Sequence, residues 1–219
     1  MWHTVHDDDR KKDQQLYRKY RPRSIKTIIG NEAIVEDIRK FAKMKTGRPH
    51  AYMLHGPPGC GKTTCGRILG KKLGPARHSN DFLELDTASY SGIDAIKKLC
   101  YIARLYPRGR ARVFLLDEAH NLSPKAQEAL LKLFEEPPPK TFLILCTTKP
   151  GKIIEPLRQR CIIFQVQPLS DEGALDLIER VCRKEGKNIP EDVKKEIIER
   201  SKGIPREILQ HLERTFLRY

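Results

Sequence analysis

The residues with the clearest chemical meaning form a glycine-rich run at positions 56–63, which fits the pattern G-x-x-x-x-G-K-[ST] at every fixed position. In such a loop the glycines let backbone N–H groups turn toward a β-phosphate, Lys62 reaches the β- and γ-phosphate oxygens, and the Thr63 hydroxyl binds Mg²⁺. An apolar stretch precedes the run and a helical pattern follows it, which disfavours an incidental glycine-rich turn. The predicted nucleotide-binding residues here are Gly56, Pro57, Pro58, Gly59, Cys60, Gly61, Lys62, Thr63 and Thr64.

A second candidate element is the acidic pair Asp117 and Glu118, which directly follows four apolar residues at 113–116. Consecutive apolar residues suit a central parallel strand that is buried on both faces and opens into a nucleotide crevice at its carboxyl end. Asp117 is then expected to hold Mg²⁺ through water, and Glu118 to orient or polarise the attacking water. The alternative is that both carboxylates merely begin the next helix. Asp-Glu-Ala-His also occurs in helicases, but 219 residues leave no room for two motor domains.

The arrangement of apolar patterns predicts an α/β fold in which strands alternate with helices around a parallel sheet. Five strands are expected, at residues 50–55, 82–85, 112–116, 141–147 and 161–166. After Pro168 the periodicity is purely helical, which predicts a small lid domain of three helices. The expected organisation is therefore a disordered polar lead at 1–15, an ATPase domain at 16–167 and the lid at 168–219.

The charge of the chain favours a polyanionic partner, for which nucleic acid is the obvious candidate. The formal net charge is +14, from 42 Lys and Arg against 28 Asp and Glu. Much of the excess lies in residues 10–23 and 97–112. The alternative is a solvated basic face without a partner.

Cysteine usage and hydropathy indicate the compartment. The six cysteines include no C-x-x-C pair, and several lie in apolar runs, so we expect reduced thiols and neither a zinc site nor a disulfide framework. The sequence shows no signal-peptide pattern and no apolar run long enough to span a bilayer. We therefore expect a cytoplasmic protein without membrane contacts.

Two arginines lie at positions where a positive charge suggests a functional role. Arg206 falls in the first turn of the last predicted helix, where the macrodipole disfavours positive charge, and a γ-phosphate would compensate. Arg160 precedes the last predicted strand, where a permanently charged planar donor could serve as an arginine finger. For each, the alternative is an ordinary ion pair.

With these residues in hand, the chain resembles the clamp-loader branch of the AAA+ ATPases, and most closely the ATPase core of the bacterial DNA polymerase III gamma/tau subunit family. The resemblance covers almost everything after Gln15. It is carried by five stretches: LYRKYRP at 16–22, IGNE at 29–32, FLELDTAS at 82–89, DEAH at 117–120 and ALLKLFEEPP at 129–138.

The resemblance implies roles for further residues. Thr147 would be the sensor-1 residue that contacts the γ-phosphate, with Thr148 as the near alternative, and Arg206 would be sensor 2. Arg160 would act on the ATP of a neighbouring subunit. The adenine pocket would be lined by Tyr17, Arg21, Pro22 and Ile29, and the first choice for DNA contacts is Lys97 and Lys98.

Three features depart from the family pattern. The finger triplet reads Gln159-Arg160-Cys161, where the family has Ser-Arg-Cys, which puts the local support of Arg160 in doubt. Only residues 74–81 stand where the gamma/tau subunit carries a four-cysteine zinc module. The sequence ends at Tyr219, before the family's helical collar domain, which suggests a naturally short relative or a fragment.

The sequence therefore predicts an ATP-hydrolysing, Mg²⁺-dependent clamp-loader subunit. It would bind primer–template DNA and, with other loader subunits across ATP-bridged interfaces, load a sliding clamp. Two alternatives stay open. One is an AAA+ helicase loader or transposition regulator, and the other is a stator subunit that does not turn over ATP.

Overall fold

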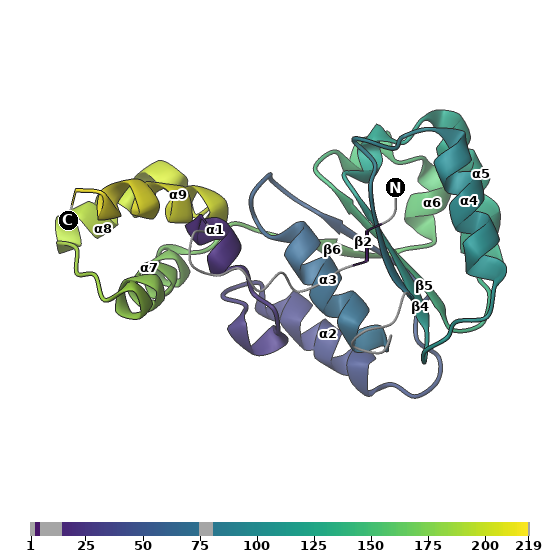
Figure 1. The fold of residues 1–219 in the computed structure, drawn as a ribbon, viewed down its shortest axis with the longest axis horizontal. Helices are drawn as coiled ribbons and strands as arrows, with labels where there is room; N and C mark the ends of the chain where they lie inside the picture. The colour runs from purple at the N-terminus through teal and green to yellow at the C-terminus, as the bar shows by residue number, and fades with distance from the viewer. Residues whose placement is uncertain (1–2, 5–14, 75–80, 219) are drawn as a thin grey trace.

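A six-stranded sheet lies at the centre of the larger part of the molecule, with strands in the order β1-β3-β4-β5-β2-β6 (Figure 1). The computed structural model describes residues 3–4, 15–74 and 81–218. Strands β2 to β6 run parallel, which confirms the predicted five-stranded parallel sheet. Their bounds are β2 (Ala51–His55), β3 (Phe82–Asp86), β4 (Arg112–Asp117), β5 (Thr141–Thr147) and β6 (Ile162–Gln165).

The sixth strand, β1 (His3–Thr4), corrects the prediction that all of residues 1–15 are disordered. It pairs antiparallel with β3, opposite Glu84 and Leu83. An edge strand offers unpaired N–H and C=O groups to any extended segment, so this pairing leaves little trace in side-chain composition. Residues 1–2 and 5–14 lie outside the described part of the chain, so for them disorder remains a prediction from the sequence.

Helices cover both faces of the sheet (Figure 1). Alternation along each strand sends Leu115 into one hydrophobic core and its neighbour Leu116 into the other. The first layer contains α2 (Glu32–Lys43) and α3 (Lys62–Leu73), and the second α4 (Ile93–Arg104), α5 (Pro124–Glu135) and α6 (Glu155–Gln159). Short 3₁₀ turns lie at Ile25–Thr27, Ala119–Asn121 and Pro150–Lys152. Because both faces are covered, the charged side chains of the central strands β2, β4 and β5 lie at the strand ends.

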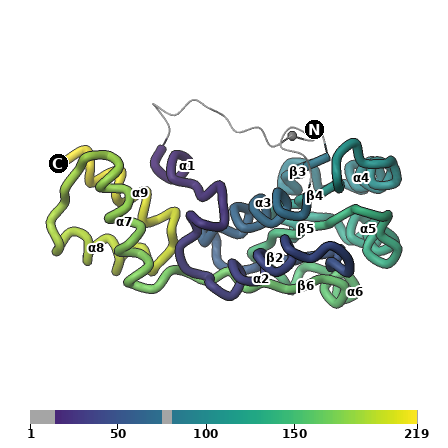
Figure 2. The backbone as a smooth tube through the Cα atoms, turned by 90° about the horizontal axis from the view of Figure 1, so that it is seen from below, coloured from purple at the N-terminus to yellow at the C-terminus, as the bar shows by residue number. Residues whose placement is uncertain are grey.

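The lid consists of α7 (Asp171–Glu185), α8 (Glu191–Ser201) and α9 (Pro205–Phe216), and it lies at the end of the molecule opposite α4 and α5 (Figure 2). The short helix α1 (Leu16–Lys19) joins it, although the sequence placed residue 16 onward in the ATPase domain. Leu16 is buried in the lid core and donates its backbone N–H to Glu213 Oε1 at 3.0 Å. The first helix therefore ties the segment that leads into the sheet to the three C-terminal helices.

Membrane and thiol properties follow from the same structure. No helix within residues 15–74 or 81–218 has the length and apolar character needed to cross a membrane. The six cysteines are free. Burial raises the pKa of Cys65 to about 11 and that of Cys146 well above its usual value, so both thiols are neutral at pH 7.

A buried ion pair fixes the end of α4 against the sheet. Arg112 and Asp81 are 6% and 1% exposed, and Arg112 Nη2 lies 2.8 Å from Asp81 Oδ1. Arg112 also donates to the carbonyls of Leu105 and Tyr106, and Asp81 Oδ2 accepts from Gly109 N. Both charges are thus satisfied inside the protein.

Asp81→Ala leaves the Arg112 charge buried without its partner, so we expect the free energy of unfolding to fall by about 3–5 kcal/mol in urea denaturation followed by circular dichroism. The matched control is Glu196→Ala, which removes the exposed 2.7 Å pair with Arg200. That change is expected to cost about 0.5 kcal/mol or less. Equal losses for the two variants would contradict the structural role of the buried pair.

Candidate nucleotide-binding site

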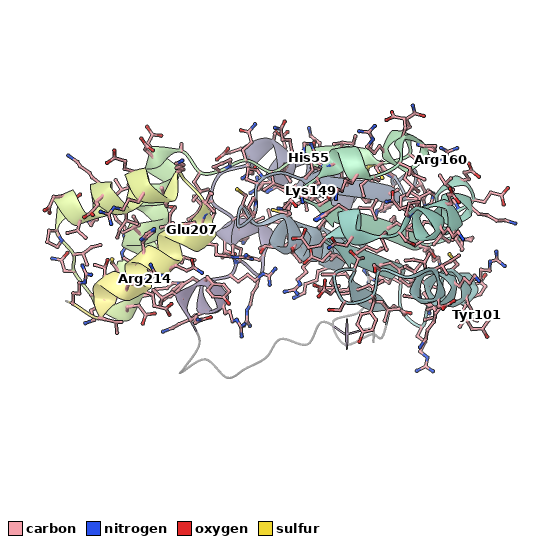
Figure 3. The ribbon with its side chains drawn as sticks, turned by 90° about the horizontal axis from the view of Figure 1, so that it is seen from above. His55, Tyr101, Lys149, Arg160, Glu207 and Arg214 are labelled. Carbon is pink, nitrogen blue, oxygen red and sulfur yellow. The ribbon has the colours of Figure 1, made fainter. Side chains whose placement is uncertain are left out.

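The carboxyl ends of β4, β5 and β2, which are neighbours in the sheet, bring the predicted site residues to one edge. The glycine-rich loop follows β2, Asp117 ends β4, and Thr147 ends β5 opposite His55. In Figure 3 this edge is marked by His55 and Lys149. Parallel strand order, not proximity in the chain, therefore assembles the site.

The glycine-rich loop has a backbone that side chains would disrupt. Gly56 has φ of 147°, and a Cβ there would lie 2.1 Å from the Val166 carbonyl oxygen. Gly59 has φ of 80°, and a Cβ there would lie 2.7 Å from Ile204 of the lid. The loop then leads into α3, whose N-terminus favours an anion. Of the other loop residues, Pro57 and Pro58 are exposed, Cys60 is buried and Gly61 is half-buried.

Lys62 is the cation inside this loop. It is only 5% exposed, and its Nζ donates to the Pro57 carbonyl oxygen at 2.8 Å. Burial lowers the pKa of Lys62, whereas the nearby Glu118 carboxylate opposes that shift. The contact with Pro57 uses one of the three donors of an ammonium group, so Lys62 retains donors for phosphate oxygens.

Thr63 and Asp117 form the candidate Mg²⁺ site. The Thr63 hydroxyl lies 2.9 Å from both carboxylate oxygens of Asp117. Burial raises the pKa of Asp117, and the hydrogen bond from Thr63 works against that rise. A bound divalent cation would favour the ionised carboxylate further. Hydroxyl and carboxylate oxygens are the ligands that Mg²⁺ prefers, so this pair fits the ion.

Glu118 stands at a sharp turn immediately after β4. Its backbone is left-handed, with φ of 51°. The fully buried Thr87 secures this turn, because its hydroxyl lies 2.9 Å from the Asp117 carbonyl oxygen and 2.6 Å from that of Glu118. The Glu118 side chain is 39% exposed and so remains accessible to water. Sequence reasoning gave Thr87 no role, and only its place in the FLELDTAS stretch could have drawn attention to it.

Thr147 is fully buried, and its hydroxyl oxygen accepts a hydrogen bond from Lys149 N at 3.0 Å. The same oxygen lies 3.1 Å from His120 Nδ1. The alternative residue, Thr148, lies just beyond the end of β5 and is half-buried. Thr147 is therefore the threonine that is built into the network around Glu118.

The lid and the N-terminal segment reach the loop from the other side. A Cβ at Gly59 would lie 3.2 Å from Arg206 Cβ, and the Arg206 guanidinium lies 5.8 Å from the centre of the Tyr17 ring. Arg21 Nε donates to the Thr64 hydroxyl at 2.9 Å. Burial lowers the pKa of Arg21 to about 10, which still leaves it charged at pH 7. The structure thus brings Arg206, Tyr17 and Arg21 to the loop.

The other two predicted adenine-pocket residues, Pro22 and Ile29, are half-buried. Ile29 packs against the edge of the lid core, where a Cβ on Gly173 would lie 3.4 Å from it. Ile29 therefore packs against the lid, beside which an adenine pocket is expected, whereas the structure gives Pro22 no contact that assigns it to a pocket.

Arg160 lies apart from this cluster. Figure 3 shows it beyond His55 and Lys149, toward the end of the molecule that is distant from the lid. Its Nη2 donates to Glu135 Oε1 at 2.8 Å and its Nη1 to the Pro156 carbonyl oxygen at 2.8 Å. Within one chain Arg160 is therefore held by an ion pair, which is the alternative that the sequence left open, and the structure identifies Glu135 as its partner.

The predicted DNA contacts, Lys97 and Lys98, are exposed on α4. The same helix continues into an exposed apolar group made of Tyr101, Leu105 and Tyr106, which are 66%, 48% and 90% exposed. Figure 3 shows Tyr101 projecting outward at the end of the molecule away from the lid. The exposed lysines on α4 and the exposed apolar residues at and just after its C-terminal end therefore lie close together in the chain.

The chain is similar to known protein families and to individual proteins. Two family models match the chain, "DNA polymerase III, delta subunit" over residues 79–170 and "Rad17 P-loop domain" over residues 7–96. DNA polymerase III subunit gamma/tau of Mycobacterium tuberculosis is 34% identical over 90% of this chain. DNA polymerase III subunit gamma of Buchnera aphidicola is 35% identical over 91%, and the Replication factor C small subunit of Aeropyrum pernix is 34% identical over 89%.

The chain spans 38% of the length of the mycobacterial relative and 60% of the other two. Among solved structures, the RuvB Holliday junction branch migration motor of Thermotoga maritima superposes with a TM-score of 0.74, at 24% identity over 89% of this chain and 64% of that one. The likeness to RuvB is one of fold alone. Sequence, fold and glycine-rich loop together identify the chain as a nucleotide-binding AAA+ core of the clamp-loader type.

Proposed function

We propose that this chain is an ATP-hydrolysing clamp-loader subunit that acts in the cytoplasm on primer–template DNA and helps to load a ring-shaped sliding clamp. The observation that carries the proposal is the meeting of Lys62, the Thr63–Asp117 pair and Glu118 at one edge of the sheet. The similarity to clamp-loader subunits over about nine tenths of the chain supports the biological role.

In the proposed reaction the loop and the N-terminus of α3 hold the triphosphate, and Lys62 balances the charge on its β- and γ-oxygens. Thr63 and Asp117 would hold Mg²⁺, which would withdraw charge from the same oxygens. Glu118 accepts a proton from the water that attacks the γ-phosphorus. The bond from that phosphorus to the bridging oxygen then breaks, and ADP is the leaving group. Arg160 of a neighbouring subunit would stabilise the charge of the transition state.

The surface of α4 supports the proposed partners. Lys97 and Lys98 present two solvated cations, as phosphate contacts require. The exposed group of Tyr101, Leu105 and Tyr106 is the kind of apolar patch that marks a protein interface. We propose that the first group contacts DNA and the second a protein of the loading machinery, either the clamp or another subunit.

Two alternatives compete with this proposal. A helicase loader or transposition regulator shares the AAA+ fold, but the relatives described above are clamp-loader subunits. A stator that does not turn over ATP is disfavoured because Lys62, Thr63, Asp117 and Glu118 are all in place. Comparing the ATPase rate with and without primed DNA and the host's clamp separates these alternatives.

The first prediction separates binding from chemistry. Lys62→Ala removes the cation that accompanies the phosphates, so ATP affinity or turnover is expected to fall about 100-fold or more. Glu118→Gln keeps ATP binding, but turnover is expected to fall by roughly 10²–10⁴-fold because the proton acceptor is lost. Equilibrium binding of a fluorescent ATP analogue and phosphate release measure the two effects. Unchanged turnover in Glu118→Gln would remove this residue from the mechanism.

The second prediction tests whether Arg160 acts in trans. Arg160→Ala and Lys62→Ala are each expected to be inactive alone, yet their mixture is expected to regain ATPase activity, because each variant supplies what the other lacks. The matched control is Glu135→Gln, which frees Arg160 from its ion pair and leaves activity in place. Normal hydrolysis by Arg160→Ala alone, or no recovery on mixing, would contradict a trans-acting finger.

The third prediction concerns the charge on α4. Each lost phosphate contact reduces the slope of log affinity against log salt by about 0.9, so Lys97→Ala/Lys98→Ala is expected to lower it by nearly two for primed DNA. The control is Lys43→Ala/Lys195→Ala, which removes two exposed lysines from α2 and α8. Equal slopes for both double variants would show that α4 does not face DNA. Fluorescence anisotropy over a salt series provides the measurement.

A further inference from the structure

One side chain at the centre of the site has no role in the mechanism above. His120 lies in the short 3₁₀ turn after Glu118, and its side chain is 10% exposed. Its Nδ1 lies 3.1 Å from the Thr147 hydroxyl oxygen and 3.3 Å from Glu118 Oε2. A single ring nitrogen thus faces both the proposed γ-phosphate sensor and the proposed proton acceptor.

That nitrogen cannot serve both neighbours in the same way. In the neutral ring, Nδ1 carries either a hydrogen or a lone pair. With a hydrogen it can donate to the Glu118 carboxylate or to the Thr147 oxygen. With a lone pair it can accept only from the Thr147 hydroxyl, and it then turns a lone pair toward Glu118. The tautomer of His120 therefore decides whether Glu118 has a donor at this position.

The direction of the Thr147 hydroxyl hydrogen can change in this arrangement. The Thr147 oxygen already accepts from Lys149 N, so its hydrogen can point to His120 or, when a nucleotide is bound, to a phosphate oxygen. Turning it to the phosphate removes the donor that a lone pair on Nδ1 requires. The tautomer with hydrogen on Nδ1, which can hold Glu118, is then favoured.

The surroundings favour tautomer exchange over a change in charge. Burial lowers the pKa of His120, and Lys149, Lys152 and Lys62 act in the same direction against the Glu118 carboxylate, so the ring is neutral at pH 7. The backbone is fixed as well, because Thr87 holds the carbonyl oxygens of Asp117 and Glu118. Any signal from Thr147 to Glu118 must then pass through side chains.

We propose that His120 is a positioning residue that couples Thr147 to Glu118 through its Nδ1, so that the sensor threonine orients the catalytic carboxylate only when a γ-phosphate is present. The coupling rests on the proposed ATPase function. It explains how Glu118, whose side chain is partly open to solvent, could be kept from acting before the nucleotide is in place.

The test uses three variants of His120 that differ in whether, and where, the side chain keeps a polar atom. Asparagine at position 120 keeps one near the place of Nδ1, glutamine keeps one near the place of Nε2, and leucine keeps none. The assay uses primed DNA and saturating Mg²⁺. For His120→Asn we expect a kcat within about threefold of that of the unsubstituted chain. For His120→Gln and His120→Leu we expect kcat to fall roughly 10–100-fold. KM, ATP affinity and thermal midpoint are expected to stay nearly constant. Equal kcat values for the asparagine and glutamine variants would overturn the coupling.

A double-mutant cycle tests the partner. Thr147→Val removes the hydroxyl, and if His120 acts through Thr147, the double variant with His120→Gln is expected to be no slower than the slower single variant. If the double variant instead lost kcat by the product of the two single losses, the two residues would act independently, which would contradict the coupling between His120 and Thr147.

A readout without catalysis separates this inference from the proposed function. In the free protein the ¹⁵N shift of His120 Nδ1 is expected to change in Thr147→Val, and an unchanged shift would overturn the contact. A chain that binds ATP and Mg²⁺ but releases no phosphate would contradict the proposed function and the catalytic coupling together, whereas normal turnover with equal His120 variants would contradict the coupling alone.

Discussion

The structure depends on one constraint, which is that the central strands β2, β4 and β5, covered on both faces, accommodate charge only at their ends. Val113, Phe114, Leu115 and Leu116 are all fully buried, and the chain becomes polar only at Asp117. Because β2, β4 and β5 are parallel neighbours, their polar ends share one edge. The glycine-rich loop, the acidic pair and Thr147 therefore meet without any need for contact between their strands' side chains.

A second level of organisation connects this edge to the lid. Gly59 of the loop lies so close to Ile204 and Arg206 of the lid that a Cβ there would meet both of them. The helix after the loop accepts a hydrogen bond from Arg21 through the Thr64 hydroxyl. Leu16, a few residues before Arg21, is buried in the lid core. Two chain segments that are far apart in sequence thus link the phosphate loop to the same helical unit. A nucleotide that changes the conformation of the loop would therefore shift the position of the lid through both chain segments.

The features that could be predicted from the sequence are those that depend on short-range residue patterns. The five parallel strands, the end of β4 at Asp117 and the three C-terminal helices all appear as predicted. Contacts between distant segments could not be predicted in the same way. The docking of α1 on the lid, the pairing of His3 and Thr4 with β3, and the bond from Thr87 to the Glu118 turn depend on tertiary placement, which short-range periodicity does not encode.

We propose that this edge of the sheet binds ATP and hydrolyses it in response to DNA. The most direct measurement is phosphate release from the unmodified chain at saturating ATP and Mg²⁺, with and without primer–template DNA, alongside equilibrium ATP binding. We expect turnover that requires Mg²⁺ and rises with primed DNA more than with single-stranded DNA. Stoichiometric ATP binding without phosphate release, in the presence of primed DNA, partner subunits and clamp, would contradict the account and favour a stator.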